Sequence, residues 1–194
     1  MKLIIASDIH GSLKYTKKLE ELINQENPDN IVLLGDLLYH GARNALPEEY
    51  STLEVSNILN KYSNKIIAVR GNCDSEVDDM VTNFDIMSDY KSIEVDGINI
   101  YLTHGHLIPK YEHLFQDKYL LSGHPHIYNL EGKHINPGSV GIPKVNPEHT
   151  CILYKNKTFY LINLENLSII KETPLNEEWY HSYWSIRRLH TSCR

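Results

Sequence analysis

The fold is decided near the start of the chain, by the segment 2-KLIIASDIHGS-12. Its apolar first part, Lys2–Ala6, is typical of a buried β-strand. Asp8 and His10 follow at once and carry side chains that bind metals, while Gly11 lets backbone and ligand come close together. The segment therefore predicts a strand that presents polar side chains at its carboxyl end.

Strand-like and helix-like stretches alternate through the rest of the first half. Apolar residues recur at helical spacing over Ser12–Glu26, and Ser12 can cap the N-terminus of that helix. Apolar runs predict strands over Ile31–Leu34 and Ile66–Val69, with a second helix around Leu53–Leu59 between them. This β-α-β-α-β rhythm predicts parallel strands joined by right-handed crossovers.

The second half of the chain is expected to be mostly β structure. Asp96-Gly97 lies between two apolar runs, which is a strong hairpin signal, and predicts strands over Ser92–Val95 and Ile98–Leu102. Further short strands are expected over Tyr119–Leu121, Lys133–Ile135, Cys151–Tyr154 and Thr158–Leu164. No repeat or low-complexity linker interrupts the sequence, so one mixed α/β domain is expected over residues 1–170.

Residues 171–194 are set apart as a C-terminal tail of unknown role. The tail holds both tryptophans, Trp179 and Trp184, shows poor periodicity, and has Pro174 near its start. A segment that does no chemistry is the favoured interpretation. A sequence that arises from cloning or from a shifted reading frame is one alternative, and an aromatic and basic segment that binds a partner is another.

Composition and charge exclude some classes of protein. With a formal net charge of −6 in 194 residues, the chain lacks the basic balance that binding to a nucleic-acid polymer needs. Small anionic substrates stay open, because bound divalent metals would reverse the local field. Three scattered cysteines suit a reducing compartment, and no apolar stretch approaches the roughly 18 residues of a membrane span, so a cytoplasmic protein is expected.

Five polar clusters each follow an apolar run. They are Asp8-Ile9-His10-Gly11, Gly35-Asp36, Gly71-Asn72-Cys73-Asp74, His104-Gly105-His106 and Gly123-His124-Pro125-His126. Any one of them also suits a turn, a helix cap or a solvated strand end. Ligands of open α/β sheets bind outside the carboxyl ends of the strands, so clusters that are distant in sequence can converge there. The recurring oxygen and imidazole donors favour one shared site.

The donor types narrow the choice of ligand. Carboxylates, an amide oxygen and imidazoles, without paired thiolates, suit manganese, iron, nickel, cobalt or zinc better than magnesium alone. The donors outnumber the four ligands of a single tetrahedral zinc, which indicates two divalent ions. Two such ions can clamp the attacking and leaving oxygens of an in-line phosphoryl displacement.

Taken in order, the motifs D-x-H, G-D, G-N-[HC]-D, H-G-H and G-H-x-H resemble those of the calcineurin-like metallophosphoesterase superfamily. Within it, the chain is similar to the small bacterial YfcE-type phosphodiesterases. The closer likeness rests on residues 7–12, 40–47, 69–78, 102–107 and 136–140, and the resemblance as a whole covers about residues 1–170. It implies a four-layer α/β/β/α sandwich with mixed β-sheets and a metal site at one rim.

The resemblance also implies a role for each motif residue. One metal ion, most simply Mn²⁺, would be held by Asp8, His10 and His126, a second by Asn72, His104 and His124, and Asp36 would bridge them. A hydroxide shared by the two ions would then attack the phosphorus atom of a small phosphodiester. The expected catalytic residues are Asp36, Asn72, Cys73 and Asp74.

Two positions depart from the pattern of many relatives. Cys73 stands where they carry a histidine that is proposed to protonate the leaving group, and a thiol is a poor substitute, which favours diesters over monoesters. A nucleophilic role for Cys73 is disfavoured, because an activated water suffices. Pro125 replaces a common threonine but leaves both flanking imidazoles in place.

Further polar residues near the motifs could meet the substrate. His40 and Arg43 follow Asp36, and an arginine suits bidentate contact with a phosphate, although a structural salt bridge is equally open. His106 could contact the substrate or orient a metal ligand. The rival functions are a phosphomonoesterase and a protein-interaction scaffold with this fold but without catalysis. Association into homo-oligomers is open.

Overall fold

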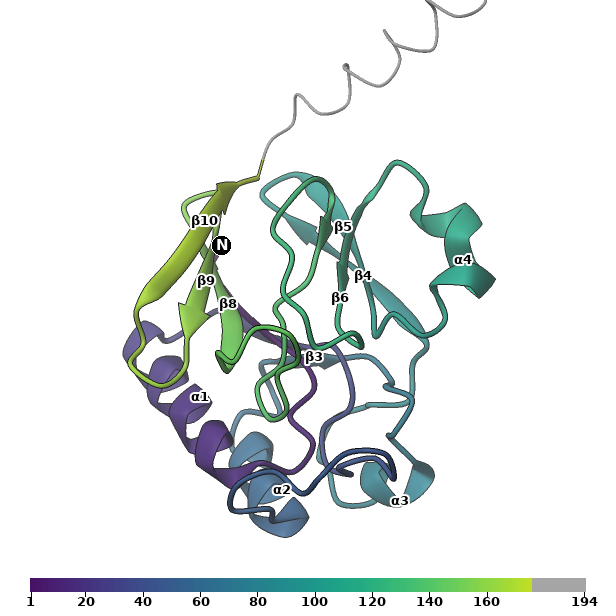
Figure 1. Cartoon of the computed structure of the whole chain (residues 1–194). Coiled ribbons are helices and arrows are strands. Elements are labelled where there is room, and N and C mark those ends of the chain that lie inside the picture. The colour runs from purple at the N-terminus through teal and green to yellow at the C-terminus, as the bar shows by residue number, and fades with distance from the viewer. Residues whose placement is uncertain (176–194) are drawn as a thin grey trace, which may run out of the picture.

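Two β-sheets pack face to face, and helices cover their outer sides (Figure 1). The computed structural model describes residues 1–175. The six-stranded sheet has the order β10-β9-β8-β1-β2-β3. Its strands are β1 (Leu3–Ala6), β2 (Asn30–Leu33), β3 (Ile66–Ala68), β8 (Thr150–Lys155), β9 (Thr158–Asn163) and β10 (Ile169–Pro174). The four-stranded sheet, in the order β4-β5-β6-β7, consists of β4 (Tyr90–Val95), β5 (Ile98–Thr103), β6 (Tyr119–Ser122) and β7 (His134–Ile135).

Strand β1 shows why the first sheet lies between two layers. Leu3 and Ile5 point into the core between the sheets, whereas Ile4 and Ala6 point into the core beneath the helices. Because both faces of the strand are covered, its apolar run is continuous rather than alternating. β1 pairs in parallel with β2, and β2 with β3, which confirms the predicted parallel strands, while β8 joins the other edge of β1 antiparallel.

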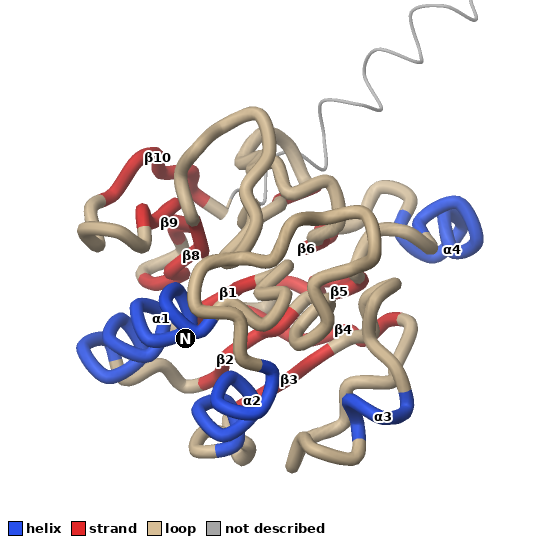
Figure 2. Tube along the Cα trace, turned by 60° about the horizontal axis from the view of Figure 1, so that its bottom comes forward, coloured by secondary structure: helices blue, strands red, loops and turns tan. Residues whose placement is uncertain are grey.

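Helices α1 (Leu13–Glu26) and α2 (Thr52–Asn60) lie side by side against the first sheet (Figure 2). α1 begins after Ser12, as predicted, and buries its apolar stripe in the core beneath the helices. A short helix, α3 (Glu76–Asp79), follows the loop after β3 and begins with a capping box between Ser75 and Asp78. None of the helices among residues 1–175 is both long enough and apolar enough to cross a membrane.

The second sheet carries the fourth layer. Its β4–β5 hairpin turns at Asp96-Gly97, as predicted, and α4 (Ile108–Phe115) then connects β5 to the parallel strand β6. Phe115 of α4 packs its ring against Tyr90 and Tyr101 of the hairpin. The order helix, sheet, sheet, helix confirms the expected four-layer α/β/β/α sandwich with mixed sheets.

Strand β10, like helices α3 and α4, was not predicted from the sequence patterns. It crosses residue 170, because pairing with β9 continues from Ile169 to Pro174, and the following Leu175 is buried. Most side chains of this edge strand are exposed, so it has no apolar alternation to reveal it. Trp179 and Trp184, which define the expected tail, lie outside the described residues.

Candidate metal centre

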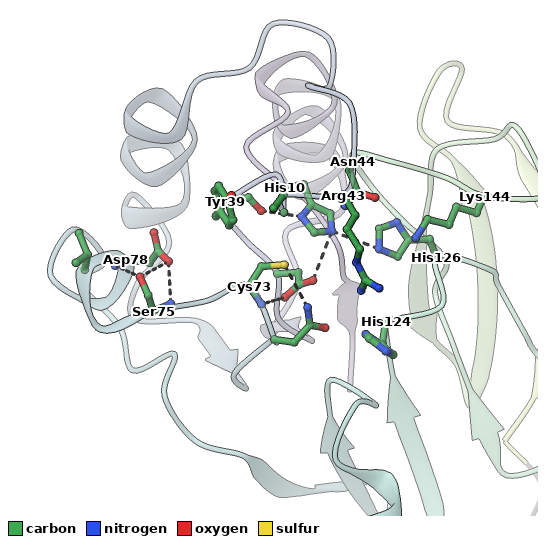
Figure 3. A pocket seen from close by; sticks show the side chains of 15 residues that line it. His10, Tyr39, Arg43, Asn44, Cys73, Ser75, Asp78, His124, His126 and Lys144 are labelled. Atoms are coloured by element: carbon green, nitrogen blue, oxygen red, sulfur yellow. Dashed lines mark hydrogen bonds and ion pairs between the residues drawn. The ribbon is translucent and has the colours of Figure 1, made fainter.

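Loops from both sheets meet at one rim of the sandwich. The parallel strands β1, β2 and β3 all end there, and so do the parallel strands β5 and β6 of the second sheet. Every predicted ligand lies in one of the loops that follow these strands: Asp8 and His10 after β1, Asp36 after β2, Asn72 after β3, His104 after β5, and His124 and His126 after β6. Figure 3 shows His10, His124, His126 and Cys73 facing a common space.

Four of the predicted ligands form a compact buried group. The ligand atoms of Asp8, His10, Asp36 and His126 all lie within 4.8 Å of one another. His126 Nε2 is 3.3 Å from Asp8 Oδ1, and His10 Nε2 is 3.5 Å from Asp36 Oδ2. His10 Nε2 is also 3.3 Å from His126 Nε2. Two carboxylates and two imidazoles therefore surround a single point, which suits a divalent cation.

Asp8 supplies an independent sign of that cation. Its Oδ2 accepts the backbone N–H of His124 at 3.0 Å, but Oδ1 is buried and has no hydrogen-bond donor among residues 1–175. A buried carboxylate oxygen without a donor is costly, and it is rare in folded proteins. A cation at the centre of the group would satisfy Oδ1, so the residues fit a metal ion.

The histidines are oriented as metal ligands. In three of them Nδ1 lies beside a backbone carbonyl oxygen: 2.7 Å from Tyr39 for His10, 2.6 Å from Leu34 for His104, and 2.5 Å from Ile142 for His126. A carbonyl only accepts, so Nδ1 must carry the proton in each ring. The lone pair of each neutral ring is then on Nε2, which faces the site.

Asp36 lies between two sets of donors. Its Oδ2 is 3.5 Å from His10 Nε2 on one side and 3.4 Å from His104 Nε2 on the other. On the second side, Asn72 Oδ1 is 3.1 Å from His104 Nε2, and the ring of His124 lies 5.1 Å from that of His104. This intermediate position is where a carboxylate that bridges two ions would be needed.

The backbone is strained at the ligands themselves. Asp8, His10, Asp36, His124 and His126 all have positive φ, with values of 54°, 50°, 55°, 81° and 59°. Residues other than glycine adopt this left-handed region rarely and at a free-energy cost. Five such residues at one site indicate that the surrounding structure holds the loops in position for the side chains they carry.

Asp74 joins the loop after β2 to the loop after β3. Its Oδ2 accepts the N–H groups of Asp36 at 2.8 Å and Gly71 at 2.7 Å, and its Oδ1 accepts the N–H of Leu37 at 2.8 Å. A Cβ on Gly71 would collide with the carboxylate of Asp36, so only glycine allows this approach. Asp74 was predicted to be catalytic, but these contacts occupy both of its oxygens and place it behind the ligands.

The charges of the site are strongly coupled. Burial alone would raise the pKa of the Asp36 carboxyl, but the His104 imidazole and the N–H of Cys73 outweigh it and hold that pKa below its ordinary range. For His104, burial opposes protonation, but Asp36 and Asp8 raise the pKa to about 9. Burial and the carboxylate of Asp36 raise the pKa of the Cys73 thiol to about 12. Cys73 is therefore a protonated thiol at neutral pH.

A cavity of about 860 Å³ opens over the ligands. Of the three predicted substrate contacts, one lies in its described wall and two do not. Arg43 lines it, is exposed, and has no ion pair within residues 1–175. His40 lies behind the wall, because its ring packs edge-on between Tyr39 and Tyr50. His106 stands beside His104, with ring centroids 5.4 Å apart, and likewise is not part of the described wall.

Tyr39 and Lys144 are among the residues of the cavity wall that were not predicted as site residues. Tyr39 follows Leu38 in the loop after β2, and Lys144 lies in the long loop before β8. Neither belongs to a motif with ligand spacing, so no local pattern points to them. Only the folding of both loops over the same rim brings them to the site.

Comparison with known proteins agrees with this geometry. Residues 1–158 match the family model of the calcineurin-like phosphoesterase superfamily domain. Phosphodiesterase YfcE of Escherichia coli K12 is 42% identical over 182 residues, which cover 91% of this chain and 99% of that protein. The solved structure of the E. coli phosphoesterase Yfce superposes with a TM-score of 0.81 at 40% identity, over 91% of this chain and 100% of the other.

More distant structures share the fold alone. Vps29 of Entamoeba histolytica, solved in complex with Zn²⁺, superposes with a TM-score of 0.60 at 20% identity, over 91% of this chain and 100% of the other. Because the family model matches most of the length of this chain, the chain belongs to the calcineurin-like phosphoesterase superfamily.

Proposed function

We propose that the protein is a metal-dependent phosphodiesterase that hydrolyses small phosphodiesters at a site for two divalent ions. The observation that carries the proposal is the position of Asp36 Oδ2 between His10 and His104, at 3.5 and 3.4 Å. Similarity to phosphodiesterase YfcE over nearly the whole of both chains supports the reaction class.

The seven predicted ligands divide naturally between two ions. Asp8, His10 and His126 would hold one ion, with Asp36 shared, and the orphaned Oδ1 of Asp8 supports this half. The other ion would be held by Asn72, His104 and His124. Imidazole, carboxylate and amide donors together suit Mn²⁺. When bound, the two ions would lower the pKa of a water molecule between them and offset negative charge on the phosphoryl oxygens.

The chain's own residues supply orientation. The Nδ1 hydrogen bonds to backbone carbonyls fix the imidazole planes, and Asp74 fixes the loop that carries Asp36. Arg43 brings into the cavity a guanidinium that makes no ion pair with residues 1–175, and it can bind a phosphoryl oxygen of the substrate there. Binding and orientation of the phosphodiester then place its phosphorus atom at the metal site.

Cys73 favours diesters as substrates. A general acid works best when its pKa lies near the working pH, and the thiol of Cys73 has a pKa of about 12. Cys73 is therefore a poor proton donor to a leaving oxygen, which disfavours monoesters with poor leaving groups. It is also too weak an acid to act as a thiolate nucleophile at neutral pH.

An assay on metal-free protein tests the proposal. EDTA-treated protein would be offered bis(4-nitrophenyl) phosphate and 4-nitrophenyl phosphate, before and after Mn²⁺ is restored. We expect no turnover without metal, and faster turnover of the diester than of the monoester with it. Absence of turnover with every divalent ion tested would favour the scaffold interpretation, and faster monoester turnover would favour a phosphomonoesterase.

A further inference from the structure

The cavity over the metal centre has two chemically different ends. Tyr39 and Lys144 lie on opposite sides of His10 and His126 (Figure 3). The end near Tyr39 also holds Ser75 and Asp78, and it carries no cation from the described wall. A diester has two ester arms, so one arm would lie at each end.

Lys144 is held at its end of the cavity by its backbone. Its N–H donates a hydrogen bond to the carbonyl oxygen of His126 at 3.1 Å, which ties the lysine to a predicted metal ligand. Its side chain lines the same cavity as the rings of His124 and His126. The lysine therefore belongs to the site, although no motif includes it.

The charge of Lys144 is unbalanced. The side chain is exposed and makes no ion pair with any residue in the described part of the chain, whereas other exposed lysines do, such as Lys17 with Glu49 at 3.3 Å. A solvated surface lysine is the ordinary explanation of such a residue. Beside a centre for divalent cations, however, an ammonium repels the ions it faces, unless an anion lies between them.

The balance of charges argues against the scissile phosphate as the anion that lies between Lys144 and the metal ions. A phosphodiester carries one negative charge, and the metal ions and Arg43 would already face it. An anionic group on the ester arm near Lys144 would instead face the ammonium alone. We propose that Lys144 is a specificity residue, and that the preferred substrates are phosphodiesters with a second anionic group, a carboxylate or phosphate, on one ester arm.

The inference rests on the proposed phosphodiesterase function, and a matched pair of substrates tests it. 4-Nitrophenyl 4-carboxyphenyl phosphate and 4-nitrophenyl 4-carbamoylphenyl phosphate have nearly the same shape and the same leaving group, but only the first has the second charge. We expect kcat/KM of the wild-type protein to be about fivefold higher for the carboxylate, the size expected of a partly exposed ion pair. The difference should lie in KM rather than in kcat.

Variants show whether Lys144 is the cause. Lys144→Met should abolish the preference, so that kcat/KM becomes equal for the two substrates, whereas Lys144→Arg should retain the preference. Lys18→Met is the matched control, because Lys18 pairs with Glu21 on the exposed side of α1. A preference that survives in Lys144→Met overturns the inference, as does a wild-type protein that turns over both substrates equally.

Binding provides a readout that does not depend on turnover. Calorimetric titration of the Mn²⁺-loaded protein with 4-carboxyphenyl phosphate and with 4-carbamoylphenyl phosphate should give dissociation constants that differ about fivefold in the wild type and not in Lys144→Met. Equal constants in the wild type overturn the inference. No turnover of either diester, with the binding preference intact, overturns the proposed function and with it the substrate preference, and leaves Lys144 only as the group that binds the second anion.

Discussion

In the proposed two-metal centre, Asp36 is the residue on which both halves would depend. Its Oδ1 accepts the N–H of Cys73 at 2.7 Å, and its Oδ2 faces the histidines of both halves. An amide keeps the shape of the side chain but brings only one neutral oxygen, so it cannot bridge two cations well. The consequence should be seen in catalysis and metal binding far more than in folding.

For Asp36→Asn we predict a loss of about 10²- to 10³-fold in kcat for the diester, the size seen when a group that stabilises the transition state is removed. The midpoint of thermal unfolding of the metal-free variant should stay within a few degrees of wild type. Asp117→Asn, at an exposed turn, is the control and should leave both quantities unchanged. Undiminished turnover in Asp36→Asn would contradict a shared ligand.

His104 predicts how metal binding depends on pH. Burial opposes its protonation, but Asp36 and Asp8 raise its pKa to about 9, so the metal-free site holds an imidazolium at neutral pH. A metal ion must displace that proton, because only neutral Nε2 binds metal. Affinity for Mn²⁺ should therefore rise with pH, by up to about tenfold per unit between about pH 6.5 and about 8.5.

Calorimetric titrations in buffers of different ionisation enthalpy measure the protons released when Mn²⁺ binds. The expected result is release of about one proton per chain near neutral pH. Binding without proton release, with an affinity independent of pH, would show that His104 is neutral before the metal arrives.

The loops after β2 and β3 depend on Asp74 for their conformation. Its carboxylate accepts three backbone N–H groups, those of Asp36, Gly71 and Leu37, and it is buried. Alanine would leave these donors buried and without partners. We predict that Asp74→Ala lowers the free energy of unfolding by about 3 kcal/mol and weakens Mn²⁺ binding, because the loops lose their common acceptor.

Urea unfolding and metal titration of Asp74→Ala measure these two effects. Asp29→Ala is a suitable control, since Asp29 accepts one backbone N–H, that of Lys2, at an exposed position. The control should lose less than about 1 kcal/mol and keep its affinity for metal. A similar loss of stability in both variants would contradict the proposed role of Asp74.

The elements also show what the sequence can and cannot predict. Buried strands such as β1 can be predicted from the sequence because both of their faces are apolar, and the spacing of the motifs indicates the ligands at their ends. The edge strand β10 and the site residue Lys144 could not be predicted from the sequence, because both are exposed and their positions depend on residues far away in the chain. His40 is a similar case: proximity to Asp36 suggested a substrate contact, but its ring packs edge-on against Tyr50, behind the described cavity wall.

Across the whole molecule, polar contacts of Asp96 tie the two sheets together at the end of the β4–β5 hairpin. The hydroxyl of Tyr154, on β8, donates to Asp96 Oδ2 at 2.7 Å, and the amino terminus contacts Asp96 Oδ1 at 3.3 Å. The Tyr154 hydrogen bond, and then the amino terminus, lower the pKa of Asp96. The ionised form of Asp96 is therefore favoured by folding.

A group whose pKa is lowered on folding stabilises the protein above its unfolded pKa, about 3.9 for an aspartate, and this stability is lost as pH falls through the lower folded value. Tyr154→Phe should therefore reduce the free energy of unfolding by about 1 kcal/mol at neutral pH. The difference from wild type, measured by urea unfolding, should shrink below about pH 4. A difference that is constant with pH would mean that the charge on Asp96 plays no part.

We propose above that the rim of the sandwich holds two metal ions that share Asp36. The most direct measurement is the amount of Mn²⁺ retained per chain, by elemental analysis after equilibrium dialysis, with diester turnover assayed on the same samples. We expect diester turnover to rise with the fraction of chains that hold a second Mn²⁺ ion. Asp36→Asn should retain fewer ions per chain and lose activity. Full turnover with one ion per chain, or with none, would contradict this proposal.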